Sequence, residues 1–173
     1  GLANRDRFHT ILGTEIEAVT TKGRGAVGVV VVDIDAFKTV NDSWGHAVGD
    51  KYLIHVARQM RAVLPETVEL ARFAADEFAV VLPVRSILDV ESLAVAVSKS
   101  IGEIFFPDRH STYRGTASIG YAVYPNDVAI SHSPDDSSAA LLRHANAAMM
   151  SAKRTKQTYP LRFDFARDEQ NEQ

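Results

Sequence analysis

The sequence predicts an α+β fold, an α/β sandwich in which helices flank a central sheet that contains antiparallel strands. Three observations support this class. Segments with apolar residues at helical spacing alternate along the chain with β-branched segments. The apolar run at residues 26–32 is continuous, which is typical of a central strand buried on both faces. Two short strands near the middle are separated only by residues 74–76, which predicts an antiparallel hairpin rather than a doubly wound sheet.

The first half of the chain is expected to begin with a helix and to contain three of the strands. The helix covers residues 5–20, where apolar residues recur at helical spacing, and Asn4 is its expected N-cap. Apolar residues at the same spacing mark a second helix around residues 53–60. The expected strands of this half are residues 26–33, 67–73 and 77–82.

The second half is expected to contain two helices and two strands. A helix follows Asp89, with an apolar face that runs to Ile104. A strand is expected over residues 116–124. The last long helix opens at Ser133, which is followed by a proline and two aspartates, the preferred composition of a helix start. Residues 161–165 are expected to form a final short strand.

Length and composition limit the classes of function. The 173 residues fit one domain, expected over residues 1–160, with residues 161–173 as the last strand and a polar connector. A formal net charge of −3 without a basic stripe argues against nucleic-acid binding. The chain has no cysteine, which excludes disulfides and thiolate metal sites. No apolar run is long enough to cross a bilayer, so membrane contact is not expected.

The first residue, Gly1, is not a methionine, and we interpret the chain as part of a longer protein. The expected location of the domain is the cytoplasm, which leaves open a membrane-anchored full-length protein.

Two acidic pairs are the first candidates for chemistry. Asp33 and Asp35 come at the end of the buried strand, where open sheets commonly place ligand groups. Asp76 and Glu77 come from the hairpin, whose strands should lie beside that strand. Carboxylates of this kind suit Mg²⁺, and two clusters on adjacent strand ends can form a two-metal clamp for phosphoryl or nucleotidyl transfer. Each pair alone is more often a solvated turn, and only their joint spacing favours a site.

Further polar residues follow the first acidic pair. Lys38 can offer an ammonium group to phosphate oxygens. Asn41 and Asp50 supply an amide and a carboxylate, which suit the edge of a guanine ring.

These patterns together resemble the GGDEF family of diguanylate cyclases. Residues 1–5 (GLANR) are similar to its opening G-L-P-N-R. Residues 33–50 (DIDAFKTVNDSWGHAVGD) match D-x-D-x-F-K-x-x-N-D-x-x-G-H-x-x-G-D. Residues 72–78 (RFAADEF) stand at the signature R-x-G-G-D/E-E-F, and Ala152-Lys153 at the family's A-K pair. The resemblance runs nearly end to end.

The resemblance implies a ferredoxin-like, palm-type core and a reaction that joins two GTP molecules into cyclic di-GMP with release of two pyrophosphates. Two subunits would face each other for this reaction, so a homodimer is expected. Mg²⁺ or Mn²⁺ would be held by Asp33, the carbonyl of Ile34, Asp76 and Glu77, with Asp76 and Glu77 also catalytic. GTP would be contacted by Phe37, Lys38, Asn41, Asp50, Ala74, Ala75 and Lys153.

The sequence departs from the family at three places. Both signature glycines are alanines, Ala74 and Ala75. Glycine is used where the backbone adopts positive φ or passes close to a ligand. An alanine there would be strained, or its methyl group would shift the bound α-phosphate, so we expect catalysis to suffer more than GTP binding. Gln157 replaces the phosphate-binding arginine of the family's ending. Pro65 and Val68 stand where the inhibitory R-x-x-D motif has its key residues, so no inhibitory cyclic di-GMP site is expected.

Three functions are therefore compared. The favoured one is a GTP-binding module with weak or no cyclase activity that regulates an attached domain. The alternative is a working diguanylate cyclase. The third, a dimerisation domain without ligand, is disfavoured because the acidic and guanine-reading residues are retained. The polar tail over residues 162–173 resembles the connector to an EAL phosphodiesterase domain, so such a domain or a sensor is the expected attached partner.

Overall fold

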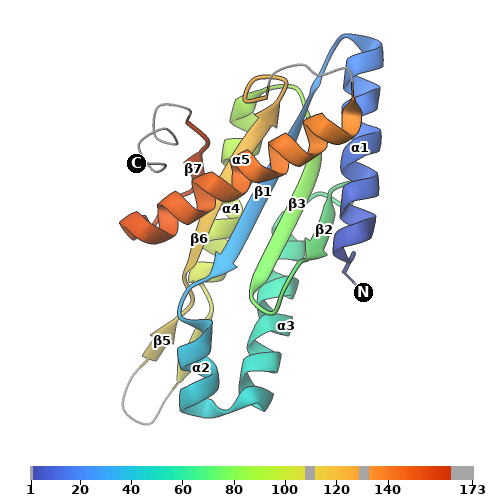
Figure 1. Cartoon of the computed structure of the whole chain (residues 1–173). Helices are drawn as coiled ribbons and strands as arrows, with labels where there is room; N and C mark the ends of the chain where they lie inside the picture. The colour runs from blue at the N-terminus through green and yellow to red at the C-terminus, as the bar shows by residue number, and fades with distance from the viewer. Residues whose placement is uncertain (1, 108–111, 129–132, 165–173) are drawn as a thin grey trace.

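The computed structural model describes residues 2–107, 112–128 and 133–164. Within this part of the chain a five-stranded sheet, in the order β2-β3-β1-β6-β7, forms the centre (Figure 1). The helices are α1 (Arg5–Lys22), α2 (Phe37–Trp44), α3 (His46–Val63), α4 (Ile87–Gly102) and α5 (Pro134–Thr155). The strands are β1 (Ala26–Ile34), β2 (Glu69–Arg72), β3 (Glu77–Val84), β4 (Phe105–Pro107), β5 (Thr112–Arg114), β6 (Ala117–Tyr124) and β7 (Leu161–Arg162).

The central position of β1 in the sheet explains the continuous apolar run at residues 26–32. It pairs antiparallel with β3 on one side and with β6 on the other, and all of its residues are buried. β2 and β3 form the predicted antiparallel hairpin, and β7 pairs parallel with β6. The predicted α+β class with a palm-type antiparallel sheet is confirmed.

Helices cover both faces of the sheet in two separate layers. Because side chains alternate along a strand, Val30 and Val32 belong to the core under α3 and α4, whereas Val29 and Val31 belong to the core under α1 and α5. In Figure 1, α5 crosses one face of the sheet and α4 lies on the other. By the same alternation Asp33 faces the α5 side. α2 follows directly from the end of β1, and together with α3 it closes that end of the sheet (Figure 1).

Three helix starts have the side-chain caps that the local sequence favours. The side chain of Asn4 accepts a hydrogen bond from the backbone N–H of Arg7, as predicted for α1. Ser133 caps α5, with proline in its first turn. Ser86 and Asp89 form a reciprocal capping box at the start of α4. Asp89 therefore lies inside the first turn of that helix, which begins at Ile87 and not after Asp89 as the sequence predicted.

Other boundaries and three elements differ from the prediction. The sequence analysis missed α2, whose eight residues begin without a side-chain cap, and it missed the short pair β4 and β5. Ile104 lies beyond the end of α4, although it is buried. β2 is shorter than the predicted 67–73. β7 is limited to Leu161–Arg162, and Phe165 lies outside the described residues.

A buried ion pair fixes β7 against the rest of the sheet. The Asp127 carboxylate, which is buried, accepts hydrogen bonds from the backbone N–H of Val123 at 2.8 Å and from the guanidinium of Arg162 at 2.5 and 3.1 Å. The ring of His144 on α5 stacks on Phe163 at a centroid distance of 3.9 Å. These contacts position the chain that follows α5 along the edge of β6.

No helix in the described part of the chain combines the length and the hydropathy needed to span a bilayer. The boundary at residue 160 stays a prediction, since most of the expected connector, residues 165–173, lies outside the described residues.

Candidate functional site

Three aspartates from two loops and a strand gather at the end of β1. Asp33 is 5% exposed, and the charges of Asp76 and Asp35 both act to raise its pKa. The hairpin turn is fixed to β1 by the backbone N–H of Ile34, which donates to the carbonyl of Asp76 at 3.0 Å. Since the N–H and C=O of a strand residue point to the same side, the Ile34 carbonyl faces this turn as well. The structure thus brings the two predicted acidic pairs together.

Glu77 reaches the same end of the sheet from β3. It is the direct cross-strand partner of Asp33, and both are the last ladder residues of the β1–β3 pair at this end. Directly opposed residues of an antiparallel pair point to the same face, so Glu77 lies on the α5 side with Asp33. Glu77 is half-buried.

A lysine from α5 neutralises the buried aspartate. The ammonium Nζ of Lys153 donates to Asp33 Oδ1 at 2.8 Å, and the side chain of Lys153 stays 47% exposed. Burial raises the pKa of Asp33, although its hydrogen bond to Lys153 acts in the opposite direction. The same hydrogen bond raises the pKa of Lys153. Asp35 is held separately, because the hydroxyl of Ser118 donates to its Oδ1 at 2.7 Å.

The donor set fits a magnesium ion of the kind that shares its shell with a nucleotide. Among the described residues, no three His, Cys, Asp or Glu side chains are already grouped at metal-ligand spacing. A Mg²⁺ site of this type needs fewer protein side chains, because the ion is bound through one or two carboxylates and its shell is completed by phosphates and water. Asp33 and Asp76 supply two carboxylates, the Ile34 carbonyl is a further oxygen, and a cation already sits beside Asp33 in the form of Lys153.

The signature turn at Ala74 and Ala75 is not strained in the expected way. Within the described residues, the alanine with positive φ is Ala36, at +54°, and neither Ala74 nor Ala75 has positive φ. The expectation that these two alanines are forced into left-handed geometry is therefore wrong. Both side chains are exposed, so what they add to the turn is a pair of surface methyl groups.

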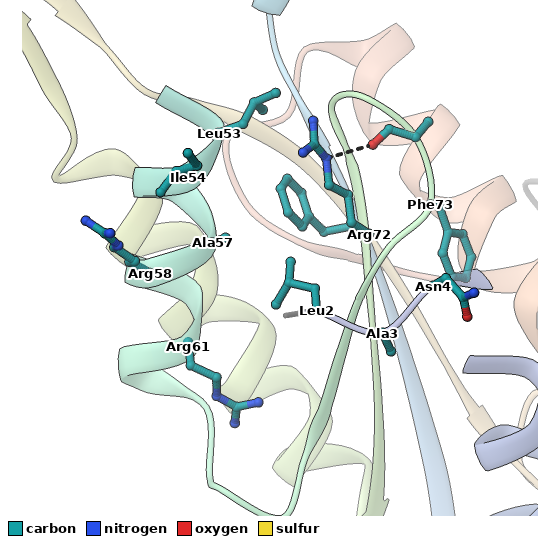
Figure 2. Close-up of a pocket in the computed structure, with 12 residues that line it drawn as sticks. Leu2, Ala3, Asn4, Leu53, Ile54, Ala57, Arg58, Arg61, Arg72 and Phe73 are labelled. Carbon is teal, nitrogen blue, oxygen red and sulfur yellow. Dashed lines mark hydrogen bonds between the residues drawn. The ribbon is translucent and has the colours of Figure 1, made fainter. Parts of the chain in front are cut away.

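Arg72 fixes the conformation of this turn. Its Nε donates to the carbonyl of Ala74 at 3.1 Å (Figure 2). Its Nε and Nη2 also donate to the carbonyl of Ala75, at 3.1 and 2.6 Å. Sequence reasoning placed Arg72 in the motif but gave it no role. No sequence signal indicated this role, because the acceptors are backbone carbonyls.

Arg72 also borders an apolar cavity of about 840 Å³ between α3 and the hairpin. Figure 2 shows Leu53, Ile54 and Ala57 of α3 on one side of it and Leu2 and Phe73 on the other. No aspartate or glutamate lines this cavity, so it is separate from the acidic cluster.

The corner between α2 and α3 holds the two residues expected to recognise guanine. The Asn41 side chain packs on Gly49, so closely that a Cβ at Gly49 would overlap Asn41 Oδ1. Asp50 follows Gly49 directly and is exposed on α3. Gly45 joins the two helices at φ +84°, a conformation that favours glycine. The G-H-x-x-G-D spacing is thus explained by one turn and one close approach.

Asn41 also presents an unmatched acceptor. Its Oδ1 is buried and has no hydrogen-bond partner among the described residues. Buried polar atoms are nearly always hydrogen-bonded, so an exception of this kind indicates a missing partner. A donor on a bound molecule would satisfy it.

The turn from β1 into α2 carries the remaining predicted residues. Ala36 is the N-cap of α2 and offers no side-chain cap, so the first N–H groups of the helix are open to an external acceptor. Lys38 is exposed in the first turn, whereas Phe37 is buried and stacks on Tyr52 at a centroid distance of 6.4 Å. Phe37 therefore fixes the helix in the core. Ala36, which precedes it, has a left-handed conformation and marks a locally strained turn.

Pro65 and Val68, at the two key positions of the family's inhibitory motif, make contacts within the fold. Val68 is buried, and its carbonyl accepts a hydrogen bond from Arg61 Nη1 at 2.8 Å. Arg61 also donates to the carbonyl of Pro65.

Comparison with known proteins identifies the family. A family model described as diguanylate cyclase, GGDEF domain matches residues 1–158. The diguanylate cyclase TpbB of Pseudomonas aeruginosa is 37% identical over 154 residues, 88% of this chain. The bifunctional diguanylate cyclase/cyclic di-GMP phosphodiesterase MucR of the same species is 38% identical over 125 residues, 72% of this chain. The crystal structure of the GGDEF domain of YfiN (TpbB) superposes with a TM-score of 0.84 at 32% identity, covering 95% of this chain and 98% of that one.

The chain spans only part of these relatives. It covers 34% of TpbB and 17% of MucR.

Proposed function

Because this chain belongs to the GGDEF family of diguanylate cyclase domains, whose members act in cyclic di-GMP signalling, we propose that it binds GTP together with Mg²⁺ and turns it over slowly or not at all. The observation that supports GTP binding most directly is the buried, unpartnered Oδ1 of Asn41, which packs on Gly49, the residue before Asp50. Guanine presents an N–H and an amino group on one edge. These donors match an amide oxygen and a carboxylate, whereas adenine presents an acceptor at the corresponding ring nitrogen.

The acidic cluster supports the metal part of the proposal. Asp33, Asp76 and the Ile34 carbonyl would hold the ion, with Glu77 beside them on β3. A bound Mg²⁺ would neutralise the phosphate charge next to the carboxylates. The chain's own groups would orient the nucleotide. The open N–H groups of α2 and the ammonium of Lys38 would donate to phosphate oxygens, and Lys153 would move from Asp33 to a phosphate.

Slow turnover is proposed on the basis of two substitutions. The methyl groups of Ala74 and Ala75 add bulk to the turn on which the α-phosphate would rest, and a displacement of about 1 Å can lower a rate on the order of 10²-fold. Gln157 offers no charge where the family's ending has an arginine. Both changes affect the reacting phosphates and leave Asn41 and Asp50 untouched, so binding should be preserved better than catalysis.

A working diguanylate cyclase is the second candidate. It is favoured by the ordinary backbone of the signature turn, in which neither alanine has positive φ, and by the retention of all the acidic residues. In that case two copies would face each other, with one GTP on each.

The relatives support a proposal about an attached partner. MucR is named as a cyclase and a phosphodiesterase, and an EAL/GGDEF protein of M. capsulatus superposes at 28% identity with a TM-score of 0.69. We propose that GTP binding here regulates an attached domain of the EAL or sensor type in the full-length protein.

Two measurements separate these functions. The first is displacement of a fluorescent GTP analogue, which GTP should achieve at far lower concentration than ATP in the presence of Mg²⁺. The second is incubation with GTP and Mg²⁺ followed by separation of cyclic di-GMP and pyrophosphate. Binding with little product supports the regulatory module, and many turnovers per protein molecule support the cyclase. Lack of any displacement by GTP would refute both.

A further inference from the structure

A second cavity, of about 590 Å³, adjoins the acidic cluster along the edge of β6. Asp35 and Ser118 line it at the end of the sheet, and Lys153 and Gln157 line it from the end of α5. The far wall comes from the last turn of α4 and from Arg114. Because β7 pairs with β6 only at residues 120–121, this part of the sheet edge stays open.

The walls of this cavity carry a strong excess of positive charge. Four cationic side chains line it against one carboxylate, that of Asp35. Lys153 is paired with Asp33, which lies next to the cavity. Lys99 and Lys156, however, have no ion-pair partner among the described residues. A cavity with unpaired cations at one end and a carboxylate cluster at the other fits a metal-bound polyphosphate.

Lys156 occupies an unusual backbone position. It is the C-cap of α5 with φ +52° and ψ +41°, the left-handed conformation in which glycine is the common residue. The turn is closed by the N–H of Gln157, which donates to the carbonyl of Ala152 at 2.9 Å. A lysine here is strained, and it lines the same cavity as Lys153 and Gln157. A strained position that faces a ligand cavity is a sign of function.

We propose that this cavity receives the terminal phosphates of the bound nucleotide, held by Lys156 with Lys99 and Arg114. The inference rests on the proposed function, since it assumes that GTP binds at the acidic cluster. It adds the residue that distinguishes GTP from GMP in this chain. Lys156 supplies, one position earlier and from a left-handed cap, the charge that Gln157 lacks.

The helix dipole offers a second explanation for the cations in this cavity. Lys99 lies in the last turn of α4, Lys156 ends α5, and Arg114 Nε donates to the carbonyl of Gly102 at 2.7 Å. Cations at helix C-termini are stabilising through the helix dipole alone. If that were their whole role, removing Lys156 would lower the stability of the domain and leave phosphate selectivity unchanged.

The variant Lys156→Gly gives opposite results for the two roles. Glycine relieves the left-handed strain, so the domain should unfold at the same or a higher temperature. We expect GTP affinity to fall about tenfold or more, as for the loss of a charge-assisted phosphate contact, while GMP affinity stays unchanged. The matched control is Arg154→Gly: Arg154 is an exposed cation on the same helix end that does not line the cavity. It should leave the GTP-to-GMP ratio as it is in the wild type.

Inorganic pyrophosphate with Mg²⁺ provides a second probe that does not need the guanine pair. It should compete with the fluorescent GTP analogue on the wild type, and about tenfold less well on Lys156→Gly. Lys156→Arg, which keeps the charge, should retain most of the competition. Equal GTP-to-GMP ratios and equal pyrophosphate competition in Lys156→Gly and Arg154→Gly would overturn the inference while leaving GTP binding in place. A wild type that binds neither GTP nor GMP would instead overturn the proposed function, and this inference with it.

Discussion

The ammonium of Lys153 lies 2.8 Å from the buried carboxylate of Asp33, in the place beside that carboxylate which we assign to a metal ion. The ion pair is asymmetric, because Asp33 is buried whereas the lysine side chain is half exposed. Lys153 can therefore leave with little cost in solvation, and Asp33 cannot. A magnesium ion that arrives with GTP would replace one cation by another and release the lysine toward the phosphates.

The first prediction concerns Asp33→Asn. Since burial is the main cause of the raised pKa of Asp33, its ionised form is less stable in the folded domain than in the unfolded chain. Asparagine removes this charge and can still accept a hydrogen bond from Lys153. We expect the metal-free domain to gain about 0.5–2 kcal/mol, and its Tm to rise by roughly 2–4 °C for each kcal/mol. Mg²⁺-dependent GTP binding should be lost. A variant that is less stable in EDTA by thermal unfolding would contradict this reading.

The second prediction concerns guanine recognition by Asp50. Asp50→Ala should reduce the preference for GTP over ATP by about tenfold or more, the usual effect of losing a hydrogen bond to a charged group. The fold should be intact because Asp50 is exposed. Competition titrations with both nucleotides provide the measurement. Asp42→Ala, another exposed aspartate of the same corner, is the control and should keep the preference; an equal loss in both variants would remove Asp50 from the guanine site.

The third prediction concerns the signature turn. Ala74→Gly with Ala75→Gly should increase cyclic di-GMP formation, by up to about 100-fold if the methyl groups displace the α-phosphate. GTP affinity should change little. Because neither alanine has positive φ, glycine relieves no strain there and should lower stability by about 0.4–1 kcal/mol at each site. Product assays and thermal unfolding test both parts. If the variant were stabilised, the backbone of this turn would have to be strained after all.

The fourth prediction is a pH dependence at the start of α4. Hydrogen bonds from the backbone N–H groups of Ser86 and Arg85 lower the pKa of Asp89 below its ordinary value of 3.8. A lowered folded pKa means that the contribution of Asp89 to stability is present above pH 3.8 and is lost as the pH falls through the folded value. Asp89→Asn should therefore lower Tm at pH 7, and the difference should shrink below about pH 4. Glu91→Gln, an exposed acid on the same helix, should show no such pH-dependent difference.

The sequence was sufficient to predict the sheet and most helices for identifiable reasons. β1 is apolar over residues 26–32 because it is covered on both faces, and the caps at Asn4 and Ser133 follow from local hydrogen bonding. α2 was missed because its eight residues carry the polar groups of the site and have no capping side chain. The pair β4 and β5 was missed because three-residue strands have no detectable period.

The site was predicted at the level of residue types and not of conformation. Spacing alone indicated that Asp33 and Asp76 meet, since both stand at the ends of adjacent strands. It could not indicate that backbone strain lies at Ala36 and Lys156 rather than at Ala74 and Ala75, because φ at a turn depends on how the flanking elements are packed. Nor could it indicate the position of Arg72, whose side chain fixes the turn through carbonyls rather than through a recognisable partner residue.

The central claim is that this domain binds GTP through a metal ion and a guanine-specific corner, and calorimetric titration of the wild-type domain tests it most directly. With Mg²⁺ present, GTP should bind in the micromolar range, and affinity for ATP should be clearly lower. Replacing Mg²⁺ by EDTA should weaken GTP binding strongly, because Asp33 and Asp76 would then repel the phosphates. No heat of binding with GTP and Mg²⁺, equal affinity for ATP, or equal GTP binding in EDTA would contradict the account.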